Sequence, residues 1–191
     1  MVVFVPVAEF TLISGQTSRL PFFAVSVALE IAGELAWGGV YVPFAGEMFT
    51  AVSGAGARLN GEPVRVSDTS RLDDSLLATG FPYDIRTCPD NNLDDFTAFA
   101  LRCRGVRRAG SAAIDFAYVA AGRLDGYWEG KLRPWDCAAG YLLVREAGGR
   151  VTDYEGREGA ISDGEMLASN GLIHVEMLEV LAESRRRRRN P

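Results

Sequence analysis

The pattern of apolar and polar residues divides the chain into a first half of strands and a second half in which strands alternate with helices. From residue 21 onward, apolar runs rich in aromatic and β-branched residues are separated by turns that contain glycine, which is typical of β-hairpins. These runs predict strands at 21–31, 35–44 and 47–52, and a Gly-rich turn region at 53–67 that leads to one more short strand. Residues 22–29 are continuously apolar, which predicts a strand covered on both faces.

The second half has the alternation of helices and strands that is typical of a layered α/β arrangement. The predicted helices are 93–105, 111–122, 134–149 and 172–184, and the predicted extended segments are 106–110, 124–130, 149–156 and 165–171. The helix at 111–122 has one apolar face, and the helix at 134–149 begins with proline and ends at glycines. The sequence contains no internal repeat and no linker long enough to separate two independent domains.

The composition is that of an average soluble globular protein, with 48% hydrophobic and 24% charged residues in a chain of 191. The best candidate for a membrane span, 21–31, is interrupted by Glu30, which excludes it. The first ten residues have no basic residue ahead of their apolar run and no clear cleavage site, so we expect no signal peptide. Cys88, Cys103 and Cys137 are odd in number and widely spaced, which argues against a disulfide framework and suits a reduced cytoplasm.

The net charge of −5 is unevenly distributed, because five of the 20 basic residues form the run Arg185–Arg189. The rest of the chain carries 15 basic residues against 25 acidic ones. An acidic body of this kind is not typical of a nucleic-acid-binding protein. We expect the arginine run to be a frayed, solvated terminus, although basic residues after a helix also interact favourably with its C-terminal dipole.

The segment from 110 to 149 carries the residue types that suggest chemistry. Gly110, Ser111 and Ala112 stand where a helix begins, and their small side chains let an anion approach the unpaired backbone N–H groups of the helix N-terminus. Asp136 lies in the first turn of the next helix, and Glu129 ends the strand between the two helices. A carboxylate at a strand end and another at a helix start can face one cleft, which suggests a phosphate or metal site.

Each of these residues also has a simpler interpretation. The position of Asp136 after a proline is that of a helix cap, and the spacing alone favours this interpretation. Glu129 suits a solvated charge at a strand end, and Gly110 with Ser111 suits an ordinary turn into a helix. The residue types alone therefore leave both interpretations open.

Further residues were considered for the site and left out of it. Arg107 and Arg108 could meet a phosphate or a partner subunit, but a solvated strand end is the simpler interpretation. His174, the only histidine, has no visible catalytic partner and is interpreted as a structural or surface residue. Cys137 follows Asp136 directly, and we expect it to be buried as packing.

The residues WDCAAGYLLVREAGG, from Trp135 to Gly149, resemble the C-terminal signature of the inositol monophosphatase family. Other segments resemble bacterial members and occur in the family's order: PFFAVSVALE, GAGARLNGEPVRVS, GFPYD and RRAGSAAIDFAYVAAGRLDGYWEG. The resemblance extends from about Pro21 to about Leu181. It implies a layered α-β-α-β sandwich of the inositol monophosphatase and sugar phosphatase fold.

The resemblance also implies an activity, the hydrolysis of inositol monophosphate or a similar polyol phosphate. In the family, magnesium ions held by carboxylates activate a water molecule and neutralise the developing charge. Asp136 matches a Mg²⁺ ligand that also touches the substrate, and Glu129 matches an acid that hydrogen-bonds sugar or inositol hydroxyls. Gly110, Ser111 and Ala112 match the segment that lines the substrate.

One part of the family pattern is missing, the D-P-x-D-G-T motif with its two metal-binding aspartates. Its place holds residues 9–20, and the first aspartate of the chain is Asp68. Glu9 is the only acid before Glu30, and we do not assign it as a ligand. We therefore expect an N-terminally truncated version of the fold. Its parts are a divergent segment at 1–20, a family domain at 21–183 with an antiparallel sheet part at 21–75 and an α/β part at 76–183, and a basic tail at 184–191.

Two consequences follow from the missing part. A site with one clear carboxylate ligand in place of about four holds magnesium poorly, so we expect weak magnesium binding and weak phosphatase activity. The helices that cover one face of the first sheet are missing too, which predicts an apolar patch and leaves a homodimer open.

Two other hypotheses remain beside that of an inositol phosphatase. The chain is alternatively a catalytically silent family member that binds a partner or dimerises, or a phosphatase for another sugar, histidinol or nucleotide phosphate. In each case we expect a cytoplasmic protein with no membrane and no nucleic-acid partner.

Overall fold

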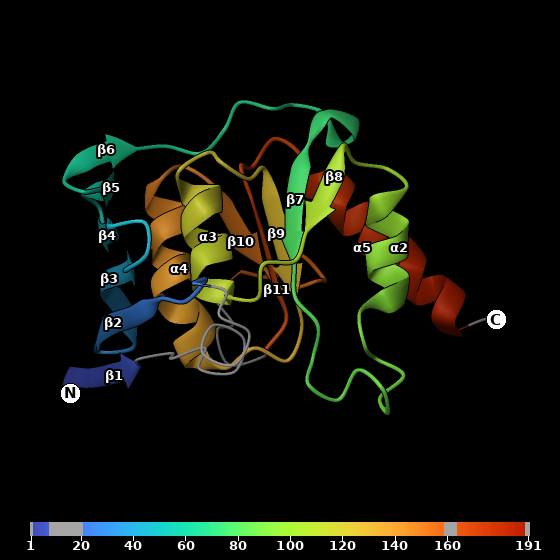
Figure 1. The fold of residues 1–191 in the computed structure, drawn as a ribbon, viewed down its shortest axis with the longest axis horizontal. Helices are drawn as coiled ribbons and strands as arrows, with labels where there is room; N and C mark the ends of the chain where they lie inside the picture. Colours follow the sequence, from blue (N-terminus) through green and yellow to red (C-terminus); the bar gives the residue numbers. More distant parts are fainter. Residues whose placement is uncertain (1, 8–20, 159–163, 190–191) are drawn as a thin grey trace.

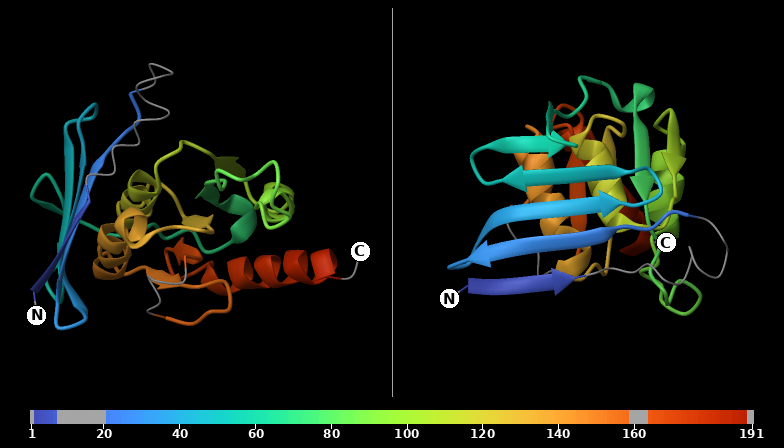
Figure 2. Two further views of the ribbon diagram at one scale, coloured as in Figure 1. Left: turned by 90° about the horizontal axis from the view of Figure 1, so that it is seen from below. Right: turned by 60° about the vertical axis from the view of Figure 1, so that its left-hand side comes forward.

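Layers of sheet and helix alternate along the molecule, as Figures 1 and 2 show. The computed structural model describes residues 2–7, 21–158 and 164–189. A six-stranded sheet forms the first layer and a five-stranded sheet the third. Helices α3 (Ala112–Ala120) and α4 (Pro134–Glu146) lie between the sheets, and α2 (Leu93–Ala100) and α5 (His174–Arg189) cover the far side of the second sheet. This arrangement confirms the predicted α/β sandwich.

The six-stranded sheet is antiparallel throughout, in the order β1-β2-β3-β4-β5-β6. Its strands are β1 (Val2–Val7), β2 (Val25–Ile31), β3 (Glu34–Val42), β4 (Glu47–Val52), β5 (Gly56–Leu59) and β6 (Glu62–Val64). The Gly-rich region thus holds two strands where one was predicted. Asn60 and Gly61 join them in a tight turn with φ values of +50° and +89°. Residues 8–20, including Glu9, lie outside the described part of the chain.

The two faces of this sheet have different surroundings. On the inner face, Ser26, Ala28 and Phe49 are buried beneath the layer that holds α3 and α4. On the outer face, Val25 and Val27 are only half-buried, and none of the described elements lies over them (Figure 2). The prediction of a strand covered on both faces is therefore wrong for the described residues, because β2 alternates between an inner and an outer face.

The second sheet is mixed, with the order β10-β11-β9-β7-β8. Its strands are β7 (Leu76–Thr79), β8 (Gly105–Arg107), β9 (Gly126–Glu129), β10 (Arg150–Thr152) and β11 (Met166–Ser169), and a 3₁₀ turn, η1 (Leu72–Asp74), precedes β7. The short strand β7 pairs in parallel with both β8 and β9. It was not predicted, because its sequence LLAT is too short to show alternation and contains no aromatic residue and one β-branched residue.

Helices α3 and α4 pack closely against each other. Gly140 of α4 faces Phe116 of α3, and a Cβ on this glycine would collide with the phenyl ring. Cys137 is fully buried in the same layer, as predicted. This packing fixes the N-terminal ends of the two helices relative to each other, and those ends carry the predicted site.

Helix α5 continues through the arginine run to Arg189, so the expectation of a frayed terminus is wrong for the described residues. Arg185 pairs with Glu165, and Arg188 pairs with Asp90 at 2.5 Å and with Asp94 at 3.1 Å. Arginine has a high helix propensity, and these acids, which lie in α2 and in the loops before α2 and β11, give Arg185 and Arg188 partners that the sequence pattern did not reveal. None of the described helices is long and apolar enough to cross a membrane.

Candidate functional site

The predicted site residues come together where the end of β9 meets the beginnings of α3 and α4. A pocket of about 500 Å³ lies at this point, and Gly110, Ala112, Glu129 and Asp136 all line it. Ser111 is placed between two of these residues, but its side chain is only 3% exposed and does not form part of the wall. The structure therefore brings together residues that the sequence separates by up to 26 positions, from 110 to 136.

The N-terminus of α3 leaves hydrogen-bond donors without a partner among the described residues. Gly110 has a φ of +99°, a left-handed conformation that favours glycine and turns the chain into the helix. Ser111 is the N-cap residue, and its side chain makes no capping hydrogen bond. Its buried Oγ has no hydrogen-bond partner among the described residues. The first backbone N–H groups of a helix also lack acceptors within the helix, so several donors are available here.

Glu129 holds its carboxyl at the wall of the pocket in a partly buried position. The hydroxyl of Tyr127 donates a hydrogen bond to Oε2 of Glu129, with an O···O distance of 2.5 Å. Gly80 makes room for this carboxyl, because a Cβ at residue 80 would collide with it. Burial raises the pKa of Glu129 from 4.5 to about 7; the hydrogen bond from Tyr127 opposes this shift and the charge of Asp136 adds to it.

Asp136 is a helix cap, as one of its two interpretations predicted, and it also lines the pocket. Its Oδ2 accepts a hydrogen bond from the backbone N–H of Arg133 at 2.7 Å, which caps the first turn of α4. No hydrogen bond among the described residues uses Oδ1, so this oxygen is available to a ligand in the pocket that Asp136 lines. The capping bond also restricts the orientation of the carboxylate.

Arg108 also lines the pocket, although the sequence analysis left it out of the site. Its side chain is exposed, as expected of a strand end, and its charge lowers the pKa of Glu129. The pair Arg107–Arg108, which Ala109 separates from Gly110, was a signal for this position. Without contacts, the sequence could not separate an arginine at the rim of a cleft from a solvated one.

An ion pair on the pocket wall was not predicted. Lys131, the only lysine of the chain, donates to the two carboxylate oxygens of Asp84 at 2.8 and 2.7 Å. The ammonium group lowers the pKa of Asp84. Lys131 has a φ of +62°, which is uncommon for a residue with a side chain and places it in a tight turn after β9. Asp84 is the last residue of the GFPYD segment. The sequence analysis used this segment for the family resemblance but assigned no role to Asp84.

Asp115 is a second acid near the cleft that the sequence analysis did not single out. Its side chain lies in the first turn of α3 and is 2% exposed. Burial raises the pKa of Asp115 well above its usual range, and the nearby charge of Glu129 raises it too. The buried position of Asp115 therefore favours its neutral form over its charged form.

The described residues do not fit a magnesium ion by themselves. Asp84, Glu129 and Asp136 are the acids on the pocket wall, and Asp84 is already paired with Lys131. Within residues 2–7, 21–158 and 164–189, no group of three or more His, Cys, Asp or Glu side chains is placed to hold a metal ion. Magnesium requires a nearly octahedral set of oxygen ligands.

The fold and the cleft define the class of the protein. Two sheets and two helix layers in alternation, with a helix N-terminus and two carboxylates at one pocket, form an α/β sandwich of the type found in sugar and inositol phosphatases. The sequence profile of the inositol monophosphatase family matches residues 13–189. The chain belongs to the inositol monophosphatase family.

Individual relatives agree with this assignment. The chain is 49% identical over 162 residues to an inositol-1-monophosphatase of Synechocystis sp., covering 85% of this chain and 56% of the relative. It is 47% identical over 160 residues to the Nus factor SuhB of Escherichia coli, covering 84% of this chain and 60% of the relative. The chain thus spans less than two thirds of the length of these curated relatives.

Solved structures show the same similarity in three dimensions. The inositol monophosphatase from Anabaena (Nostoc) sp. superposes with a TM-score of 0.87 at 46% identity, covering 89% of this chain and 68% of that one. The extragenic suppressor protein suhB from Bartonella henselae gives a TM-score of 0.83 at 41% identity, covering 95% and 71%.

Proposed function

We propose that the cleft between β9, α3 and α4 binds the monophosphate ester of inositol or a similar polyol. The observation that carries this proposal is the convergence of Glu129, Asp136 and the N-terminus of α3 on one pocket. The names of relatives such as the Synechocystis inositol-1-monophosphatase support the same substrate class. The phosphate end of such a substrate needs hydrogen-bond donors, and its polyol end needs acceptors for hydroxyl groups. The N-terminus of α3 offers the donors, and Glu129 and Asp136 offer the acceptors.

The phosphate end fits the side of the pocket that α3 forms. Backbone N–H groups of the first turn favour an anion, and Gly110 and Ala112 leave space for it to approach. The buried hydroxyl of Ser111 is one further donor close to this helix end. Arg108 adds a positive charge at the rim. A dianionic phosphate would neutralise these groups together.

The polyol end fits the side formed by Glu129 and Asp136. Each carboxylate accepts hydrogen bonds from hydroxyl groups, and Oδ1 of Asp136 is not used elsewhere in the described residues. The raised pKa of Glu129 means that half of the molecules carry its proton near pH 7. Glu129 therefore accepts hydroxyl hydrogen bonds most strongly above neutral pH.

We propose that the cleft binds the ester but hydrolyses it only slowly. Magnesium supplies several kcal/mol of transition-state stabilisation in metal-assisted phosphate transfer, and the described residues form no magnesium site. Asp136 would be one ligand of such a metal by its match to the family pattern. We expect this 191-residue chain to bind a polyol phosphate and to release phosphate from it slowly.

The test is a phosphate-release assay with myo-inositol monophosphate and magnesium, with the Synechocystis inositol-1-monophosphatase as the comparator. We expect the rate per molecule to be at least about 100-fold lower for this chain, since several kcal/mol of metal stabilisation corresponds to such a factor. Release at the comparator's rate would contradict the inference that the residues form no magnesium site. A panel of sugar, histidinol and nucleotide monophosphates in the same assay decides among the substrate classes.

One observation favours a second candidate function, that of a binding or dimerisation module. The outer face of the first sheet carries apolar side chains without a cover among the described residues. Titration of magnesium with and without inorganic phosphate separates the candidates. A chain that retains a metal site binds the two in a coupled way, whereas a silent module binds neither magnesium nor phosphate in the cleft.

A further inference from the structure

One wall of the candidate cleft belongs to the loop that joins β7 to α2, residues 80–92, which we call the cleft loop. Its first five residues, 80–84, line the cleft. In Figure 1 it is the long green loop between β7 and α2. Tyr83 in this wall is 90% exposed, so burial of its side chain does little to hold the wall in place. The contacts that position the loop therefore decide the shape of the cleft.

Asn92 ties the two ends of the cleft loop together. Its side-chain amide donates hydrogen bonds to Oγ1 of Thr79 at 2.8 Å and to the carbonyl oxygen of Gly80 at 2.6 Å. Its Oδ1 accepts the indole N–H of Trp128 at 2.8 Å. Local backbone hydrogen bonds follow within residues 82–88. The loop is thus a compact unit fixed at its base, and its outer part depends on other contacts.

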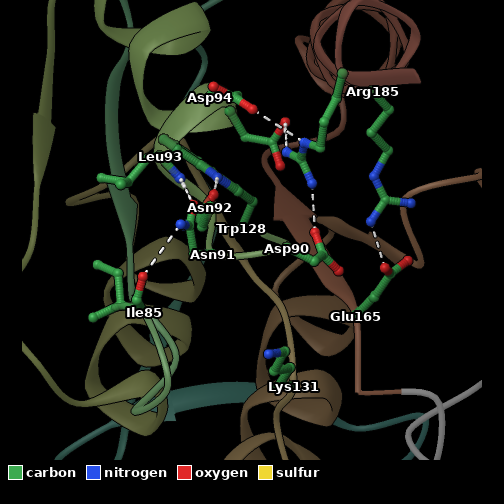
Figure 3. Close-up of polar contacts among 12 residues, drawn as sticks. Ile85, Asp90, Asn91, Asn92, Leu93, Asp94, Trp128, Lys131, Glu165 and Arg185 are labelled. Carbon is green, nitrogen blue, oxygen red and sulfur yellow. Dashed lines mark hydrogen bonds and ion pairs between the residues drawn. The ribbon is translucent and has the colours of Figure 1, made fainter. Parts of the chain in front are cut away.

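Two ion pairs attach the outer part of the cleft loop to the rest of the molecule. Asp84 pairs with Lys131, but the two side chains are 49% and 39% exposed, so this pair contributes little. Asp90 pairs with Arg188 of α5 at 2.5 Å, and the arginine side chain is only 22% exposed. Figure 3 shows Asp90 joined to α5 by this ion pair. Because water screens it less, the pair with Arg188 is the stronger attachment.

Arg188 stands between three carboxylates. Besides Asp90, it faces Asp94 at 3.1 Å and Asp95 at 3.3 Å, and the side chain of Asp95 is almost fully buried. Its positive charge compensates the repulsion among these acids. Asp94 and Asp95 belong to the first turn of α2, whereas Asp90 lies in the cleft loop. Without the arginine charge, Asp90 is the carboxylate that can move away, and the loop moves with it.

The end of α5 is itself held in place, so it can support the loop. Arg185, which lies one turn before Arg188, pairs with Glu165 directly before β11. The guanidinium of Arg185 also lies over the ring of Tyr154, 4.7 Å from its centroid. The helix end is therefore a fixed support, and the cleft loop is the part that can move.

From these contacts we infer that Arg188 is a positioning residue of the cleft. Through Asp90 it holds the cleft loop where residues 80–84 form the wall of the cleft. The arginine run at the end of α5 thereby acts as a strap on the candidate site. The effect on ligand binding rests on the proposed function, whereas the order of the loop can be measured without a ligand.

Backbone ¹⁵N relaxation of the free protein measures the order of the cleft loop. In the wild type we expect order parameters of about 0.85 in the loop, as in rigid backbone, and in Arg188→Gln values below about 0.6. The values in β9 and α3 should not change. Asp90→Asn breaks the same ion pair from the side of the loop and should loosen it too. It leaves Arg188 with Asp94 and Asp95, which gives a second test if Arg188→Gln does not fold.

Two variants separate the charge of Arg188 from a merely structural role. Arg187→Gln is the matched control, because Arg187 is an exposed neighbour in the same run and has no ion pair among the described residues. It should leave the loop ordered. Arg188→Lys keeps a positive charge and should restore most of the order. A loop that stays ordered in both Arg188→Gln and Asp90→Asn, or that loosens equally in Arg187→Gln, would overturn the inference.

Titration with myo-inositol monophosphate, followed by the indole N–H signal of Trp135 in the cleft, measures the effect on the site. We expect binding about fivefold weaker in Arg188→Gln and Asp90→Asn, because the wall is in its binding position for a smaller fraction of the time. Equal affinity despite a loosened loop would overturn the inference. A wild type that does not bind would contradict the proposed function, and the order parameters of Tyr83 and Asp84 would still decide whether Arg188 positions the wall.

Discussion

Glu129 is a residue of the cleft whose pKa its surroundings shift to about 7. Glu129 is the last residue of the buried strand β9. Its carboxylate accepts a hydrogen bond from the hydroxyl of Tyr127 and lies near the charge of Asp136. Since the folded-state pKa of about 7 lies above the usual value of 4.5, the folded state binds the proton more tightly than the unfolded state. Its contribution to stability is therefore present below about pH 4.5 and is lost as the pH rises through 7.

Two substitutions should move the pKa of Glu129 in opposite directions. Asp136→Asn removes a neighbouring negative charge and lowers the pKa of Glu129. Tyr127→Phe removes a hydrogen bond that favours the charged carboxylate and raises the pKa. Carboxyl ¹³C NMR during a pH titration of each variant measures both shifts. An equal pKa of Glu129 in the two variants would show that Asp136 and Tyr127 do not influence this carboxyl.

At the level of residues, the sequence predicted those members of the candidate site that stand at the end or the beginning of a helix or strand. Asp136 and Glu129 were visible because each stands at the end of an element, and Gly110 because it precedes a helix. Arg108 was seen and set aside, and Asp115 was not noticed, since its role depends on burial that residue types do not reveal. The roles of all these residues remain predictions.

At the level of elements, the strands and helices with strong patterns were predicted well. Strands β2, β3 and β4 carry aromatic and β-branched residues, and helices α3 and α4 have clear start signals. Strand β7 was missed because its placement depends on pairing with two strands that lie far away in the sequence. The last five residues of α5 were missed because the acids that pair with Arg185 and Arg188 belong to α2 and to distant loops.

His174 ties three elements together and makes the link sensitive to pH. It is the first residue of α5, and its ring nitrogens hydrogen-bond Thr152 of β10 at 2.9 Å and Ser169 of β11 at 2.8 Å. The side chain is fully buried, so of the two interpretations, a structural or a surface residue, the structure excludes the surface one. Burial lowers the pKa of His174 from 6.5 to about 4, and the charge of Arg150 adds to this.

Replacing His174 should change how stability depends on pH. Because its folded-state pKa is lowered, its contribution is fully present above about pH 6.5 and is lost as the pH falls towards 4. Urea unfolding at pH 7 and at pH 4.5 measures how the free energy of unfolding changes with pH. We expect this free energy to fall on acidification, and His174 to account for about 2–3 kcal/mol of the fall. His174→Gln should be less stable at pH 7 by about 1–3 kcal/mol and should show a smaller decrease on acidification. The same decrease in both proteins would contradict this assignment.

At the level of the whole molecule, the layer order follows from which faces are apolar. The inner face of the first sheet buries Ala28, Val40 and Phe49 against the α3–α4 layer, and a separate core around Phe99 and Trp128 lies between the second sheet and helices α2 and α5. The family resemblance predicted this order, whereas the hydrophobic pattern alone predicted only a layered α/β fold.

The outer face of the first sheet should make this chain associate. Val25, Val27 and Val52 belong to this face, and Val52 is 47% exposed. We expect sedimentation velocity to show concentration-dependent association that Val52→Glu reduces. Leu101→Glu is the control, because Leu101 is 82% exposed but follows α2 in a different layer. A monomer at all concentrations, or an equal effect of both variants, would refute the prediction.

The most direct test of the whole account is the binding of myo-inositol monophosphate to the proposed cleft, measured at pH 8, where Glu129 is ionised. The Trp135 indole N–H signal reports on this cleft. We expect a saturable shift in the wild-type chain and binding at least about tenfold weaker in Glu129→Gln. Glu176→Gln on the exposed side of α5 is the matched control and should bind like the wild type. A wild-type chain that shows no saturable shift, or a Glu129→Gln variant that binds equally well, would contradict the account.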